Sequence, residues 1–148
     1  MHDPRRHRAL ATIATIRDAQ RAVARHELFL AREREREAQA AREQANSETM
    51  AAAHAWETHL GEHFHPELAA GLASELMTRV EAGAAARDQA IQMTEGREAR
   101  ETEWRLGDAR CRQADQALDR SRRARARHRE ERALEALADR VSFDWSRP

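Results

Sequence analysis

The chain has 148 residues, of which 35% are charged and 4% are aromatic, and its 26 basic residues, all arginine, balance 26 acidic residues. This composition excludes a wide globular core, because large apolar residues are too few to fill one, and it predicts one domain of long helices or coiled coil. A net charge of zero excludes a uniformly basic nucleic-acid binder.

The compartment is also constrained by the sequence. A single cysteine, Cys111, excludes an internal disulfide and fits a reducing compartment. The first residues, MHDPRRHRALAT, have no long apolar core, so no signal peptide is expected, and no stretch of about 18 apolar residues could span a bilayer. We therefore expect a cytoplasmic protein with no membrane insertion.

The first predicted element is a long helix over residues 4–60. Asp3 is a suitable N-cap, Pro4 suits the first helical position, and no further proline or glycine occurs before the end of this helix. Steps of three, four and seven predict one apolar or small stripe, made of Leu10, Ile13, Ile16, Val23, Leu30, Ala38, Ala41, Ala45, Ala52 and Trp56. The charged middle, AREREREAQAARE, is interpreted as a solvated helix with internal ion pairs.

Residues 61–83 form a predicted turn region that contains a short helix. Gly61, Pro66, Gly71 and Gly83 are helix breakers, so the chain is expected to reverse here. Between them, a spacing of four residues predicts the short helix, through Leu68, Leu72, Leu76 and Val80.

A second long helix is predicted over residues 84–142, followed by a frayed tail at 143–148. Its seam is marked by Trp104, Cys111 and Leu118, which are seven apart. Two helices of similar length with a breaker-rich connection predict an all-α fold, a long antiparallel two-helix coiled-coil hairpin with a short helix near the tip.

Charge is distributed unevenly along this predicted hairpin. Residues 1–25 and residues 104–148 each carry a net charge of +4, whereas residues 57–103 carry −6. The hairpin should therefore have a basic open end and an acidic tip, which suggests different partners at the two ends.

Three histidines in the stretch HLGEHFHPELAAG raise the question of a metal site. His59 and His63 are four apart and could share a helix face, with Glu62 or His65 as a third ligand. However, Gly61 and Pro66 argue against a continuous helix, and a turn encloses little. The favoured interpretation is a polar turn without metal.

Other candidate chemistry is sparse. Cys111 lies at a seam position and is expected to be a buried structural thiol. The sequence has no lysine for a phosphate-binding loop and no recognisable nucleophile–base arrangement, so no catalytic residue, no cofactor and no enzyme activity are predicted.

The run RSRRARARHREER at residues 120–132 is the strongest basic segment. It could be a solvated helix face or a surface that docks a protein; nucleic acid is less favoured, because aromatic residues that stack on bases are absent nearby. The large apolar residues near the predicted turn could form a local core or a partly exposed patch that recruits a partner.

Two segments carry a family resemblance. HRALATIATIRDAQRAVA resembles the opening helix of the FliJ/YscO family of type III export proteins, and RHREERALEALADRV resembles its closing segment. The match at the closing segment is carried by Arg129, Glu130, Glu131, Arg132, Leu134, Glu135, Leu137 and Ala138.

The resemblance implies a non-enzymatic central stalk or coupling component of a bacterial export apparatus, peripheral to the inner membrane. Its partners would be a hexameric export ATPase at the open end, a membrane export gate at the other end, and export chaperones. The ATPase-end candidates are Arg6, Arg8, Arg17, Arg125, Arg129, Arg132 and Leu137. The tip candidates are Trp56, Leu60, Phe64, Leu68, Leu72 and Leu76.

Two alternatives stay open. One is a generic coiled-coil adaptor or dimerisation module that binds polyanions through residues 120–132. The other, less favoured, is a metal-responsive helical hairpin that uses His59, His63 and His65.

Overall fold

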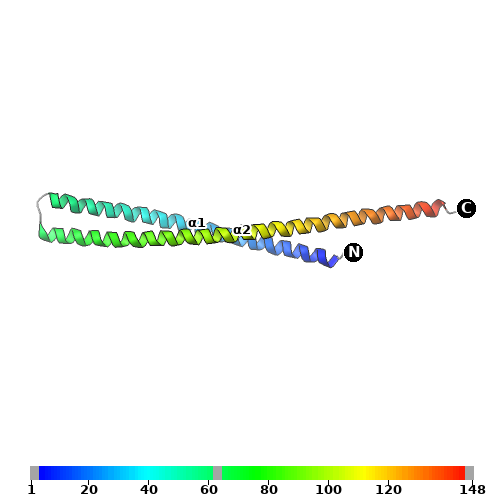
Figure 1. Ribbon diagram of the computed structural model, residues 1–148, viewed down its shortest axis with the longest axis horizontal. Helices are drawn as coiled ribbons and strands as arrows, with labels where there is room; N and C mark the ends of the chain where they lie inside the picture. Colours follow the sequence, from blue (N-terminus) through cyan, green and yellow to red (C-terminus); the bar gives the residue numbers. More distant parts are fainter. Residues whose placement is uncertain (1–3, 62–64, 146–148) are drawn as a thin grey trace. The chain divides into compact units, whose positions relative to one another are not determined.

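The computed structural model describes residues 4–61 and 65–145, and over these residues it contains two helices and no strand (Figure 1). Helix α1 spans Pro4–Gly61, with 58 residues, and α2 spans Pro66–Trp145, with 80 residues. The two helices pack against each other, which confirms the predicted all-α fold.

The chain divides into two compact units, each built from a part of both helices. The terminal unit comprises residues 1–24 and 104–148, and the hairpin unit comprises residues 25–103. A single domain was predicted from the length of the chain. The two units carry opposite charge: the terminal unit has 17 arginines and 10 acidic residues, net +7, and the hairpin unit has 9 arginines and 16 acidic residues, net −7.

Both helices begin at a proline. A proline at the first helical position has no N–H to leave unpaired, and its fixed φ suits a helix start. At the start of α2 the His65 carbonyl accepts a hydrogen bond from the Ala69 amide at 2.9 Å, and Glu67 in the first turn interacts favourably with the helix dipole. Local sequence therefore sets these two boundaries. The predicted N-cap, Asp3, lies outside the described residues.

Glycine does not interrupt α2. The short helix predicted within residues 61–83 is instead the first turns of α2, which runs without a break through Gly71 and Gly83 and continues past residue 142 to Trp145. No described glycine has a positive φ. A glycine inside a helix costs roughly 1 kcal/mol relative to alanine, which the many hydrogen bonds and contacts of a long helix outweigh. The helices are consequently unequal in length.

The core of each unit is a narrow seam of mostly small residues. In the hairpin unit the buried side chains are Leu28, Ala38, Ala69 and Ala90, and in the terminal unit they are Ala14, Cys111 and Leu118. Small residues at these positions let two helix backbones approach closely, so little apolar area is needed to fill the space between them.

One part of the predicted seam faces away from the partner helix. Ile13, Ile16 and Val23 are 45–59% exposed, whereas Ala14 and Leu28 are buried. The apolar residues near the start of α1 were expected to face inward because their spacing places them on one stripe of the helix. The seam instead passes through Ala14 and Leu28, which are fourteen residues apart on one helix face, so Ile13, Ile16 and Val23 lie beside it.

Polar contacts fix the register of the antiparallel pair in the hairpin unit. Arg79 contacts the Glu48 carboxylate at 2.5 Å, and Arg97 contacts Glu35 at 3.1 Å. Further along, Arg100 reaches Glu27 at 3.0 Å. As the residue number rises along α2 it falls along α1, so the two segments run antiparallel.

The two helices are also antiparallel in the terminal unit, but α2 extends beyond the start of α1 there. His7 Nδ1 lies 3.0 Å from Ser121 Oγ, and Arg21 lies 3.6 Å from Asp108. Because α1 begins only three residues before His7, the described part of α1 covers α2 for roughly one further turn beyond Ser121. Every described side chain from Arg129 to Trp145 is exposed.

Neither helix, over the residues described, has a stretch that is long and apolar enough to cross a membrane.

Candidate functional site

The unpartnered end of α2, residues 129–145, presents an apolar stripe. Leu134, Leu137 and Val141 are spaced by three and four residues, so they share one helix face, and each is more than half exposed. Trp145, four residues beyond Val141, extends this stripe and is 86% exposed, whereas Phe143 lies on the opposite face of the helix. Large apolar residues grouped on a helix face with no partner helix are typical of a protein-docking surface.

Most of the arginines at residues 120–132, next to this stripe, have no acidic partner in the described part of the chain. Among the described residues, Arg122 pairs with Asp119 at 3.2 Å, but the other six have no acidic partner: Arg120, Arg123, Arg125, Arg127, Arg129 and Arg132. In the same run His128 lies 3.7 Å from Glu131, with which it forms an ion pair when the imidazole is protonated. The resulting positive potential favours a partner with an acidic surface.

All seven residues predicted for the ATPase end fall in the terminal unit. Arg6, Arg8 and Arg17 lie on α1, and the other four lie on α2. Five of the seven are exposed, whereas Arg17 and Arg125 are half-buried. Arg17 donates a hydrogen bond to Gln20 Oε1 at 2.9 Å. Residues from both ends of the sequence are thus brought into one unit.

The residues predicted for the tip divide into two groups. Trp56, Leu72 and Leu76 are half-buried, whereas Leu60 and Leu68 are 48% and 54% exposed. Phe64 lies outside the described residues. The half-buried group packs within the hairpin unit, and the exposed group lies at its surface.

The histidines at the turn contact each other. The His65 backbone N–H donates a hydrogen bond to His59 Nε2 at 3.3 Å, and the two rings are stacked with centroids 6.3 Å apart. A ring nitrogen that accepts this bond is not available as a metal ligand in the same arrangement. His63 lies outside the described residues, and residues 4–61 and 65–145 contain no group of three metal-binding side chains.

Cys111 is buried in the terminal unit, as its seam position predicted. Its side chain is 1% exposed, and the thiol lies 3.8 Å from Asp115 Oδ2 as a weak donor. Burial raises the pKa of the thiol, and the Arg21 guanidinium acts in the opposite direction. A protonated, buried thiol is a structural group and a poor nucleophile.

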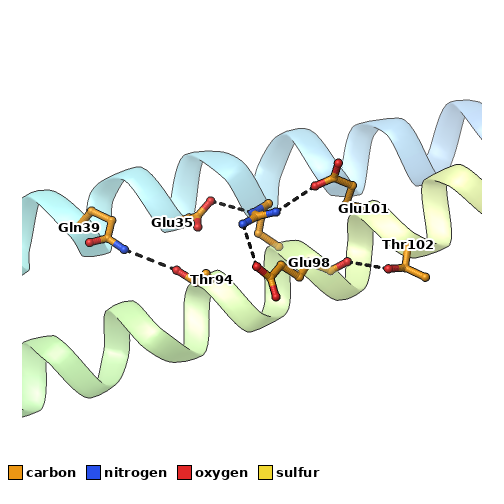
Figure 2. A network of polar contacts seen from close by, with 7 residues as sticks. Glu35, Gln39, Thr94, Glu98, Glu101 and Thr102 are labelled. Atoms are coloured by element: carbon orange, nitrogen blue, oxygen red, sulfur yellow. Dashed lines mark hydrogen bonds and ion pairs between the residues drawn. The ribbon is translucent and has the colours of Figure 1, made fainter.

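Sequence reasoning missed a cross-helix ion network around Arg97. Its guanidinium contacts Glu35 on α1 at 3.1 Å and Glu98 and Glu101 on α2 at 3.3 Å and 2.9 Å (Figure 2). The hydrogen bond to Glu35 contributes most to a raised pKa of Arg97. Arg97 and Glu101 are four residues apart, so their pairing within one helix could be read from the sequence. The contact with Glu35 depends on the alignment of the two helices, and Glu35 lies in a segment that was interpreted as solvated.

The hairpin unit also contains an open groove that no sequence motif indicated. It has a volume of about 410 Å³ and lies between the two helices. Its lining combines two arginines with small and polar residues: Arg42, Glu43, Asn46, Thr49, Val80, Gly83, Ala84 and Arg87.

Comparisons with known proteins give no relative: no family model, no curated protein and no solved structure matches this chain.

Proposed function

We propose that this protein is a non-enzymatic stalk or coupling component of a bacterial type III protein export apparatus. In this role the terminal unit docks into a hexameric export ATPase, and the exposed apolar residues near the turn contact an export gate. Export chaperones are further candidate partners. The proposal places the protein in the cytoplasm, at the inner-membrane export apparatus.

The observation that carries the proposal is the composition of the terminal unit. The two segments that resemble the FliJ/YscO family, near residues 7–24 and 127–141, belong to this one unit. The same unit carries net charge +7, unpaired arginines and the exposed stripe Leu134, Leu137 and Val141. A partner with an acidic, partly apolar surface would complement both features.

The proposed mechanism is mechanical. Docking of an asymmetric helix pair in a ring stabilises some subunit conformations over others, and a ligand shifts an equilibrium by its difference in affinity for the states. Long helices then carry that bias to a second binding partner. No group of this chain takes part in bond breaking.

The experiment is ATP hydrolysis by the export ATPase of the same genome, with and without this protein, near physiological salt. Stimulation together with a shift of the ATPase to hexamers supports the proposal. Absence of both stimulation and association excludes it.

Charge reversal at the terminal unit should abolish this stimulation. In the variant Arg125→Glu, Arg129→Glu, Arg132→Glu, the helix survives because two of these side chains are exposed and one is half-buried, and none has an acidic partner among the described residues. A matched control reverses three exposed arginines of the hairpin unit, Arg25, Arg32 and Arg34. Equal stimulation by both variants, with normal circular dichroism, would remove the docking assignment.

A second candidate is a coiled-coil adaptor that binds polyanions through residues 120–132. The observation in its favour is the same set of arginines without acidic partners. Retention on heparin that the triple reversal abolishes, with no effect on the ATPase, would favour the adaptor.

A further inference from the structure

We infer that the groove lined by Arg42 and Arg87 in the hairpin unit binds one acidic side chain of a partner polypeptide. The carboxylate would lie between the two guanidinium groups, and the neighbouring backbone of the partner would cover Gly83 and Val80. This site lies outside the terminal unit, and it does not depend on the proposed docking to an ATPase.

The helix register places the two arginines at the same level. Thr49 Oγ1 donates a hydrogen bond to the Arg79 carbonyl at 3.0 Å, and Gln39 Nε2 donates one to Thr94 Oγ1 at 3.5 Å. Arg42 lies between Gln39 and Thr49 on α1, so it faces the α2 stretch between residues 79 and 94, which contains Arg87. Both side chains line the same groove.

The groove exists because its floor lacks large side chains. Gly83 has no Cβ, and a Cβ built there would lie 3.4 Å from Thr49 Oγ1, so the helices are close at this level. Ala84 adds only a methyl group beside it. Long side chains on both rims, above a floor of small residues, leave a depression of about 410 Å³.

The two arginines of this groove have no ion-pair partner within the part of the chain that the structure describes. Arg79, Arg97 and Arg100 of the same unit each contact an acidic residue of α1, but Arg42 and Arg87 have no acidic partner there. Two like charges that line one groove repel each other, and an anion between them would offset that repulsion. Arginine is well suited to the task because its planar fork matches a carboxylate.

The surroundings favour a single carboxylate over a polyanion. The hairpin unit has net charge −7, and Glu43 lies on the rim of the groove, so a nucleic acid or a polyacidic segment would be repelled. A partner segment with one acidic residue and basic or neutral flanks complements both Glu43 and the arginines. The side-chain amide of Asn46 has no described partner and is available to it.

The open form of the groove favours a polypeptide over a small metabolite. Arg42, Glu43, Val80 and Arg87 on its rim are exposed, whereas small-molecule sites bury most of the ligand surface. A side chain presented by a larger partner needs no enclosure, because the partner itself covers the rim.

The test uses the full chain labelled with ¹⁵N and follows the arginine Nε–Hε resonances at low salt. The probe is a capped alanine-based peptide with one glutamate between two arginines, and its matched control carries glutamine in place of that glutamate. The expected result is a saturable shift of the Arg42 and Arg87 resonances with the glutamate peptide only. Arg42→Gln and Arg87→Gln should each weaken binding by about fivefold, as for an exposed ion pair, and Arg34→Gln should leave it unchanged.

Three outcomes would overturn the inference. The first is no shift of Arg42 and Arg87 at the highest soluble peptide concentration, and the second is an equal response of all exposed arginines, Arg34 included. The third is saturation by inorganic phosphate at matched ionic strength with the same affinity as the peptide, which would identify a general anion site. Loss of ATPase stimulation in the earlier experiment has no bearing on any of these results.

Discussion

At the scale of single residues, Gly96 illustrates a helix position where glycine has no structural use. It lies within α2, and no side chain lies within 4 Å of a Cβ added there. Gly96→Ala should therefore raise the free energy of unfolding by about 0.5–1 kcal/mol, through better helix propensity and a less flexible unfolded chain. Urea unfolding measures this change. A lower stability would show that a neighbour needs the space.

Cys111 should make the free energy of unfolding depend on pH in a range where no other side chain titrates. The sequence contains no lysine and no tyrosine, so above pH 8 the cysteine is the one side chain that titrates before arginine. Burial raises its folded pKa above the ordinary value of 9.0. The protonated thiol is thus favoured in the folded state, and its contribution to stability is present below pH 9 and lost as the pH rises through the folded pKa.

We therefore expect the free energy of unfolding to fall between pH 9 and the onset of arginine titration. Denaturant unfolding at several pH values measures this slope, and Cys111→Ala should remove it. A slope of the same size in the alanine variant would assign the effect to the chain terminus or to arginine.

At the scale of the helices, burial in the narrow seam determines which leucines contribute to the free energy of unfolding. Leu118 is 7% exposed, whereas Leu106, on the same helix and in the same unit, is 53% exposed. Leu118→Ala should lower the free energy of unfolding by about 2–4 kcal/mol, since it removes buried apolar contacts and leaves a cavity. Leu106→Ala, the matched control, should cost less than about 1 kcal/mol. Equal losses in urea unfolding would contradict the observed helix orientation.

The ion pairs between the helices mainly select the alignment of α1 against α2. Arg97 and Glu35 are both largely shielded, with side chains 23% and 22% exposed, whereas Arg100 and Glu27 are nearly half exposed. Exposed ion pairs contribute little to stability. A seam of alanines permits several alignments of similar packing, and these pairs select one of them.

At the scale of the whole molecule, the end of α2 should contribute to binding and not to folding. From Arg129 onward its described side chains make no buried contact. Removal of residues 129–148 should change the free energy of unfolding by less than about 0.5 kcal/mol, because an exposed segment adds little. Thermal unfolding and ATPase stimulation, measured on the same truncated chain, separate the two roles. A large loss of stability would mean that this segment packs against the protein.

Pro66 was interpreted as a helix breaker, with a second long helix only from residue 84, whereas α2 begins at Pro66. By contrast, the helical composition, the start of α1 at Pro4 and the burial of Cys111 and Leu118 were predictable from the sequence. These features depend on a residue and its near neighbours in the chain, so local physical rules suffice.

The contacts between residues distant in the sequence became known only from the tertiary structure. Arg97 and Glu35 are 62 positions apart, and the groove joins Arg42 to Arg87. Such contacts depend on the alignment of two helices, and a shift of one turn would replace every partner. The same alignment placed Ala14 inward and Ile13 outward, and it left the end of α2 without a partner helix. Propensity and periodicity carry no information on that alignment, because it is set by the sum of many weak contacts between distant segments.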